Sequence, residues 1–171
     1  VSPEHAPHFL APTLRALMPD PSCLTDMDKA AARMAQAVQA GETIGIFGDY
    51  DVDGACASAV LAAFFEQLGC SVLTHIPDRM TEGYGPNLPA LEALVAQGAT
   101  LLLSVDCGTA PSPFLTPLAR QADVVAPDHH TSDDALPDLL ATFNPNPLDS
   151  PPGPAPLCAP PLSLLAPLAP L

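Results

Sequence analysis

The fold and the chemistry of this chain are both decided by one stretch, Ile46-Phe47-Gly48-Asp49-Tyr50-Asp51-Val52-Asp53-Gly54. Three aspartates alternate within it, directly after an apolar run and directly before a helical pattern. A solvated turn is the simpler interpretation, because Asp and Gly favour turns. However, carboxylates placed between a buried strand and a buried helix repel one another, and such clusters commonly hold divalent cations. The stretch lacks the ligand spacing and the terminal Glu of an EF-hand loop. We therefore predict a cation site of another kind at this turn.

Two further motifs also follow apolar runs, Ser104-Val105-Asp106-Cys107-Gly108-Thr109 and Pro127-Asp128-His129-His130. Taken alone, Asp106 is as well explained as a helix N-cap. Adjacent histidines point in different directions, so one can bind a metal while the other faces substrate or solvent. Asp128 either orients an imidazole or caps a turn. Together, the oxygen and imidazole ligands favour a metal-dependent hydrolase that prefers manganese or magnesium over zinc.

Segments whose apolar residues follow a strand pattern alternate along the chain with segments whose apolar residues follow a helical period. Short buried strands are predicted at 43–47, 71–75, 100–105, 123–126 and 141–143, and helices at 25–40, 55–68, 87–97 and 113–121. This alternation predicts an α/β fold, a parallel sheet with helices on both faces. In such sheets the chemistry gathers at the carboxyl ends of the strands. The rule places six side chains on one rim: Asp49, Asp51, Asp53, Asp106, His129 and His130.

Three parts are predicted along the chain. Residues 1–24 form an irregular lead-in, 25–146 the α/β domain, and 147–171 a Pro-rich tail. Ten of the last 27 residues are proline, a density that disfavours helices and central strands. We therefore expect the tail to be extended or disordered.

The charge is lopsided, with 19 acidic residues against 5 basic ones and a formal net charge of −14. This balance argues against a nucleic-acid-binding surface of the usual basic kind. A polyanionic substrate would be held through bound cations or through a basic partner domain. Arg79 is one of the few cations, and a contact with substrate phosphate and a salt bridge with Asp78 or Glu82 are equally good interpretations. Arg15, Lys29 and Arg33 are predicted to form the solvated face of the first helix.

The cysteines and the hydropathy pattern indicate the cellular compartment in which the protein is expected. The five cysteines are scattered without a C-x-x-C pair, and we expect small buried thiols of a reduced protein, with neither disulfides nor a zinc site. No secretory leader is evident, and no apolar run is long enough to span a bilayer. The expected location is the cytoplasm, with no membrane partner.

At this point the motifs resemble a known family. Asp49-Tyr-Asp-Val-Asp-Gly54, Val105-Asp-Cys-Gly108 and Asp128-His-His130 look like the first three motifs of the DHH phosphoesterase superfamily. The segment Ile76 to Gly85 and the pair Asn144-Pro145 are similar to one branch of it, the RecJ exonucleases, which are specific for single-stranded DNA. The resemblance runs from about Phe9 to Asn146.

The resemblance implies a 5′-to-3′ exonuclease of DNA repair and recombination that uses two manganese or magnesium ions. Its partner would be single-stranded DNA with a 5′ end, gripped through the metals and through domains absent here. By resemblance the metal ligands are Asp51, Asp53, Asp106 and His129, with Asp106 as the bridge and Asp49 as a ligand or a neighbour of one. His130 resembles the residue that contacts the scissile phosphate, and Asp128 and His130 form the catalytic pair.

Family members also carry a fourth aspartate motif and further domains beyond the point where this sequence stops. We therefore expect a truncated chain with weak or no activity alone. Two alternatives stay open: another DHH phosphoesterase acting on oligonucleotides, cyclic dinucleotides or pyrophosphate, and a non-catalytic DHH-type scaffold module. A nucleotide-binding Rossmann domain is a weaker interpretation, because no G-x-G-x-x-G follows the first strand.

Overall fold

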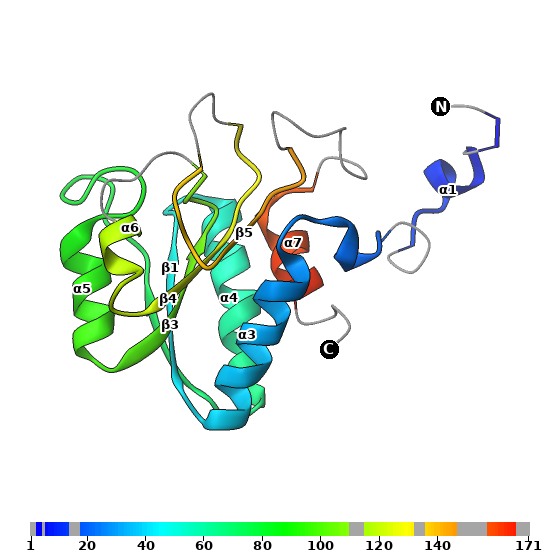
Figure 1. The fold of residues 1–171 in the computed structure, drawn as a ribbon. Helices are drawn as coiled ribbons and strands as arrows, with labels where there is room; N and C mark the ends of the chain where they lie inside the picture. The colour runs from blue at the N-terminus through cyan, green and yellow to red at the C-terminus, as the bar shows by residue number, and fades with distance from the viewer. Residues whose placement is uncertain are drawn as a thin grey trace.

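Five apolar segments pair into one parallel sheet, as the strand–helix alternation predicted (Figure 1). The strands are β1 (Thr43–Gly48), β2 (Ser71–His75), β3 (Ala99–Val105), β4 (Asp123–Pro127) and β5 (Ala141–Phe143). Their order across the sheet is β2-β1-β3-β4-β5, and every neighbouring pair is parallel. The interior strands β1 and β3 are almost wholly buried along their length. Continuous apolar runs suit them because both faces of a covered parallel sheet are dry.

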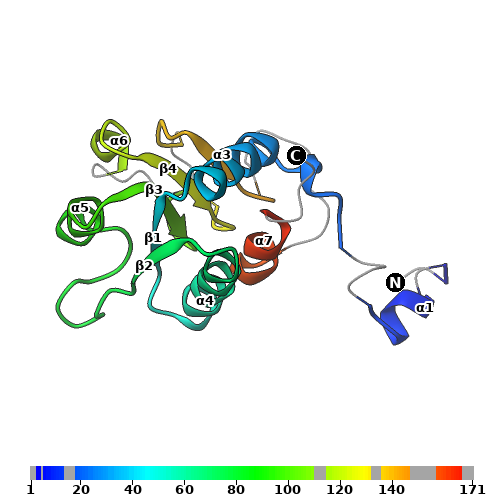
Figure 2. The ribbon, with the colours of Figure 1, turned by 90° about the horizontal axis from the view of Figure 1, so that it is seen from below.

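Helices cover both faces, which confirms the predicted fold class (Figure 2). On one face α3 (Met27–Ala40), α4 (Val52–Gln67) and α7 (Ala159–Leu165) pack in one core cluster with alternate residues of β1 and β3. On the other face α5 (Leu88–Ala96) and α6 (Leu115–Leu118) form a second cluster with Phe47 and Leu102. Alternate strand residues therefore feed two separate cores, as the pleat of a strand requires.

The computed structural model describes residues 3–4, 6–13, 18–109, 115–131, 136–146 and 157–166. In the lead-in, which we expected to be irregular, it contains a short helix α1 (Ala6–Leu10) and a 3-10 turn η1 (Pro21–Cys23). Arg15 and the start of the helix predicted at 113–121 fall outside the described ranges. Within those ranges, no helix has both the length and the apolar character to cross a membrane.

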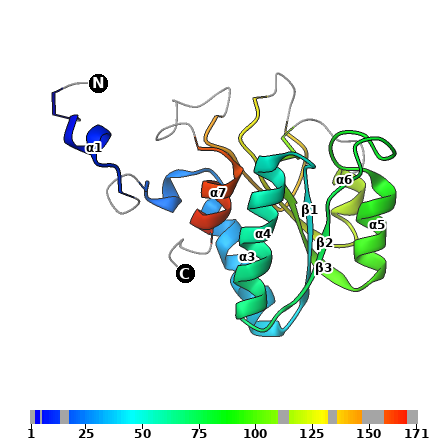
Figure 3. The same cartoon turned by 180° about the vertical axis from the view of Figure 1, so that it is seen from behind.

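The Pro-rich tail contains a helix that the sequence pattern did not predict. We expected 147–171 to be extended or disordered, but α7 occupies Ala159–Leu165 and packs beside α4 (Figure 3). Its side chains Leu162 and Leu165 are fully buried. Pro160 and Pro161 stand in the first turn, where the missing N–H groups have no partner inside the helix. The prediction was therefore wrong for this segment, while 147–156 and 167–171 lie outside the described residues.

Two predictions about the exposure of side chains were also wrong. Arg33 does not lie on a solvated face: its side chain is 10% exposed and forms ion pairs with Glu42 and Asp123. Of the five cysteines only Cys107 is buried, whereas Cys23 and Cys56 are exposed and two are intermediate. Lys29, by contrast, is exposed as expected.

The strand order sets where a ligand would bind. From β1 the chain crosses to β2 on one side and then returns to β3 on the other, so the order reverses between β1 and β3. In open α/β sheets a crevice forms at such a reversal, outside the carboxyl ends of the strands. Asp49 follows β1 and Asp106 follows β3, so these two aspartates flank it.

Candidate metal centre

Three aspartates occupy equivalent places, each being the first residue after a strand. Their backbone N–H groups continue the sheet ladder: Asp49 donates to the Val105 carbonyl at 3.2 Å, Asp106 to Pro127 at 3.0 Å and Asp128 to Phe143 at 3.3 Å. The carboxylates therefore start from positions that the sheet itself fixes. The structure confirms that all three motifs meet at one rim.

The aspartate loop is tight because two glycines let helix α4 approach it. A Cβ on Gly54 would lie 2.5 Å from the carbonyl oxygen of Asp49, and one on Gly48 would lie 2.0 Å from Ser58 Oγ. Asp51 caps the helix, with its Oδ1 accepting from Gly54 N at 2.9 Å. Capping uses one oxygen of Asp51 and leaves the other available.

The buried carboxylate of Asp106 is the strongest indication that a cation binds at this site. It is fully buried, and neither of its side-chain oxygens accepts a hydrogen bond from the described residues; the same holds for Oδ1 of buried Asp49. Burial, followed by the nearby charge of Asp51, raises the pKa of Asp106 to about 7. Burial also raises the pKa of Asp49. Such orphaned oxygens are costly, and a cation would satisfy them.

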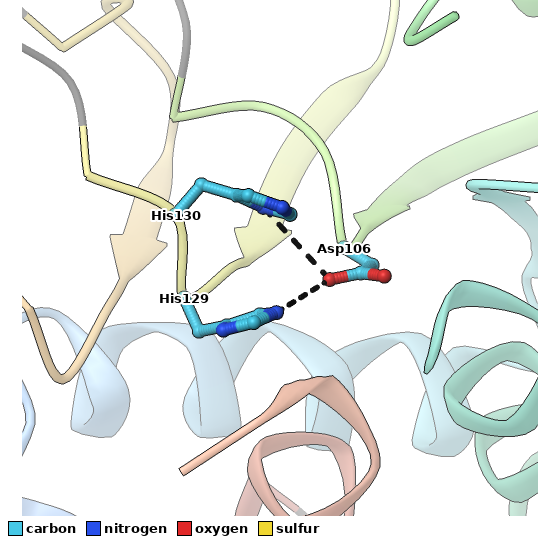
Figure 4. A group of neighbouring side chains, drawn as sticks. All are labelled: Asp106, His129 and His130. Carbon is cyan, nitrogen blue, oxygen red and sulfur yellow. Dashed lines mark ion pairs between the residues drawn. The ribbon is translucent and has the colours of Figure 1, made fainter. Parts of the chain in front are cut away.

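The two histidines approach Asp106 from the turn after β4 (Figure 4). His129 Nε2 lies 3.0 Å from Asp106 Oδ1 and 3.7 Å from Asp53 Oδ2. His130 Nδ1 lies 3.9 Å from the same Asp106 oxygen and 2.8 Å from Asp128 Oδ1. The two histidines thus share Asp106, and each has a second partner of its own: Asp53 for His129 and Asp128 for His130.

Asp128 acts as an orienting group in this geometry. Its buried carboxylate accepts from the backbone N–H of Thr109 at 2.8 Å, from that of His129 at 2.7 Å and from that of His130 at 3.2 Å. Burial alone would raise its pKa, but the hydrogen bonds from His130 and Thr109 hold the pKa below the usual value. Conversely, Asp128 raises the pKa of His130 against the effect of burial. The contacts support both interpretations left open for Asp128: it accepts backbone N–H groups of the turn, and it holds the His130 imidazole.

Two asparagines that were given no role from sequence reasoning support the histidine turn. Asn144 Nδ2 donates to the His130 carbonyl at 2.8 Å and to Thr109 Oγ1 at 3.0 Å. Asn146 Nδ2 donates to the His129 carbonyl at 2.7 Å. The available signal was the short run Asn144-Pro-Asn146 directly after β5.

Ligand atoms gather in two groups that share one residue. Asp49, Asp51 and Asp106 form one group, and Asp106, His129 and His130 the other; within each, one atom per residue lies within 4.8 Å of the rest. Asp53 belongs to neither group but lies beside His129. Carboxylates with imidazoles suit a hard divalent cation, so the residues present fit the metal that the sequence predicted.

Arg79 is the predicted site residue that stays outside these groups. Its exposed guanidinium lies over the Tyr50 ring, with Cζ 5.4 Å from the centroid. Among the described residues it makes no ion pair with Asp78 or Glu82; Glu82 instead pairs with His75 at 2.7 Å. The salt-bridge interpretation of Arg79 therefore does not hold here.

Comparison with known proteins identifies one family. The profile described as "DHH family, N-terminal domain" matches residues 43–158. That range holds every motif of the rim.

RecJ exonucleases are among the proteins similar to this chain. The single-stranded-DNA-specific exonuclease RecJ of Bacillus subtilis (strain 168) is 38% identical over 128 residues, which are 74% of this chain and 16% of that protein. A crystal structure of exonuclease RecJ bound to manganese matches 84% of this chain and 36% of its own, with a TM-score of 0.74 and 30% identity. A structure of RecJ in complex with Mn²⁺ from Thermus thermophilus matches 92% of this chain and 22% of its own, with a TM-score of 0.71 and 28% identity. The chain therefore spans a minor part of these relatives.

Proposed function

The chain belongs to the DHH family, and on that premise we propose that its strand-end rim is the metal-binding part of a phosphodiesterase that degrades single-stranded DNA. One observation carries the proposal: two ligand groups share Asp106, and neither buried oxygen of Asp106 accepts a hydrogen bond from the part of the chain that the structure describes. A carboxylate in that position is well suited to lie between two cations. Manganese and magnesium are the proposed ions, in keeping with the hard donor set and with the manganese in the similar structures.

The proposed ligands follow from the two groups. Asp49, Asp51 and Asp106 would hold one ion, and Asp106 with His129 would hold the other. Asp53, 3.7 Å from His129, is the proposed additional ligand on that side. Ions bound there supply Lewis acidity toward a phosphoryl oxygen and lower the pKa of water.

His130 is the proposed contact to the scissile phosphate. Its Nδ1 is held by Asp128 at 2.8 Å, and its side chain is 45% exposed. Asp128 raises the pKa of His130, which favours the imidazolium form. An imidazolium fixed at one nitrogen donates from the other, and donation to a phosphate oxygen offsets negative charge there. Asp128 is then a positioning residue for His130.

The finer activity is proposed from the relatives. RecJ of Bacillus subtilis is named as specific for single-stranded DNA, and we propose the same substrate here, degraded from a 5′ end in repair and recombination in the cytoplasm. Arg79 is the proposed contact for substrate phosphate near the rim. Because the chain spans 16% of that relative, we expect the 171 residues to bind metal well and to hydrolyse DNA slowly.

Calorimetry with Mn²⁺ tests the metal site. We expect the wild type to bind and Asp106→Ala to lose about 100-fold or more in affinity, since it removes the shared ligand. Asp123→Ala is the matched control, because Asp123 is an acidic residue at the opposite end of the sheet. Absence of Mn²⁺ binding to the wild type, or equal binding by Asp106→Ala, would favour the scaffold alternative.

Hydrolysis rates test the substrate. In Mn²⁺ we expect a 5′-phosphorylated single strand to be cleaved faster than a dinucleotide or pyrophosphate. The reverse order would assign the site to another kind of DHH phosphoesterase.

A further inference from the structure

We propose that Tyr50, Tyr84 and Arg79 form a platform on which a nucleobase of the substrate stacks beside the strand-end rim. The inference rests on the proposed function, since it names the part of the substrate that this chain recognises. The three residues are called the stacking platform below.

The platform is built from contacts between exposed and half-buried rings. The Tyr50 and Tyr84 rings meet edge to face, with centroids 6.1 Å apart and planes at 78°. Arg79 Cζ lies 5.4 Å from the Tyr50 centroid. Tyr84 is 62% exposed, so much of its ring is open to solvent. Pairs of aromatic rings with an adjacent guanidinium offer flat, polarisable surface.

The platform lies next to the rim. Tyr50 stands between Asp49 and Asp51 in the aspartate loop. Tyr84 meets the Tyr50 ring edge to face, so its ring lies beside the same aspartate loop. A base stacked on these rings would therefore keep its own phosphate within reach of the rim.

The loop that carries Tyr84 and Arg79 is held in shape by its own hydrogen bonds. Glu82 accepts from Asp78 N at 2.8 Å and from Asn87 Nδ2 at 3.2 Å, and it pairs with His75 at 2.7 Å. The His75 ring in turn stacks on buried Phe47, with centroids 5.6 Å apart. The loop is thus anchored to β1, the strand that leads into the aspartate loop. Preorganised rings lose little entropy on binding.

The charge of the chain favours a base as the recognised group. A net charge of −14 repels phosphates away from bound cations, whereas a base is a neutral π surface. Stacking of a base on an aromatic side chain contributes about 1–3 kcal/mol and tolerates any sequence. Single strands expose their bases and duplexes do not, so the stacking platform would select single-stranded substrates.

The composition supplies a clean probe. The chain contains two tyrosines and no tryptophan, and both tyrosines belong to the platform. With ¹³C-labelled tyrosine rings, NMR in Mg²⁺ would follow a titration with 2′-deoxyadenosine 5′-monophosphate. We expect the ring signals to move upfield and to saturate, while 2-deoxyribose 5-phosphate leaves them in place. Unmoved rings with the nucleotide, or equal shifts with the base-free sugar phosphate, would overturn the platform.

Variants sharpen the test. Tyr84→Ala should weaken nucleotide binding about tenfold, read from the Tyr50 ring, and Tyr84→Phe should keep it. Met80→Ala is the matched control, because Met80 lies in the same loop and is 89% exposed. Wild-type affinity in Tyr84→Ala would contradict the platform. Mn²⁺ calorimetry separates the two proposals: ring shifts without Mn²⁺ binding contradict the proposed function alone, and Mn²⁺ binding without ring shifts contradicts the platform alone.

Discussion

Acidic side chains at the two ends of the parallel sheet have different kinds of partner. At the amino ends, Arg33 Nε lies 2.6 Å from Asp123 Oδ2 and Arg33 Nη2 lies 2.7 Å from Glu42 Oε2. Thr100 Oγ1 adds a hydrogen bond to Glu42. At the carboxyl ends, Asp49 and Asp106 are buried with oxygens that lack any hydrogen bond from the described residues. At the amino ends the acids pair with the permanent charge of Arg33, which serves the fold. At the carboxyl ends Asp106 pairs with His129, which is charged only when protonated, and the remaining need points to a cation from outside.

The pKa values follow the same division. Hydrogen bonds from Arg33 and Thr100 lower the pKa of Glu42, whereas burial raises the pKa of Asp106 to about 7. Glu42 at the amino end therefore favours the charged carboxylate, whereas Asp106 at the carboxyl end favours the protonated acid as long as no metal is bound. Removal of charge should consequently have opposite effects at the two ends.

Removal of the Arg33 guanidinium at the amino end of the sheet should have the largest effect on stability. Arg33→Met leaves Glu42 and Asp123 without their cationic partner, and we expect the free energy of unfolding to fall by about 2 kcal/mol, since both acids keep some solvent and Glu42 keeps its hydrogen bond from Thr100. Urea unfolding in EDTA measures it. Lys29→Met is the control on the same helix and should change little, because Lys29 is exposed. Equal effects of the two variants would contradict the internal pairing.

Loss of charge at the carboxyl end should act in the other direction. In metal-free buffer at pH 8, Asp106→Asn should raise the free energy of unfolding by about 1–2 kcal/mol, because it removes a buried charge beside Asp51. The companion variant Asp123→Asn should lower it. Calorimetric unfolding of both variants in EDTA decides; destabilisation by both would erase the contrast between the ends.

The pH dependence should separate the ends again. A raised folded pKa means that Asp106 contributes stability below its unfolded value, about 4, and that this contribution is lost as the pH rises through about 7. The lowered pKa of Glu42 has the opposite sign: its contribution is present above the unfolded value and is lost on acidification. In EDTA we expect Asp106→Asn to flatten the neutral limb of the stability profile and Glu42→Gln to flatten the acid limb. If the neutral limb kept its slope in Asp106→Asn, Asp106 would not be the group whose raised pKa causes that slope.

The smallest effect is expected from the support behind the histidine turn. Asn144→Ala removes the hydrogen bonds to the His130 carbonyl and to Thr109, and we expect a loss of about 1 kcal/mol in stability and about tenfold in Mn²⁺ affinity. Thr131→Ala is a suitable control, since exposed Thr131 follows the histidines directly. A fall in stability with unchanged Mn²⁺ affinity would limit Asn144 to a role in folding.

The sequence predicted the carboxyl end of the sheet far better than the amino end. The site motifs follow continuous apolar runs, and parallel topology brings the ends of such runs together, so Asp49, Asp106 and His129 could be placed without coordinates. Arg33 could not, because its partners Glu42 and Asp123 depend on which strand starts lie beneath α3. Helix α7 was missed because proline density was weighed without regard to position within the helix. Pro160 and Pro161 fall where a helix tolerates them.

The ladder bonds made by Asp49, Asp106 and Asp128 have a mechanical consequence. To spread these carboxylates apart, the chain would have to tear neighbouring strands from one another, so the spacing of the centre is as durable as the sheet. The amides of these three residues should exchange with deuterium as slowly as those in mid-strand. Any motion needed for turnover is then expected in the loops around the centre, while the spacing of the three carboxylates stays fixed.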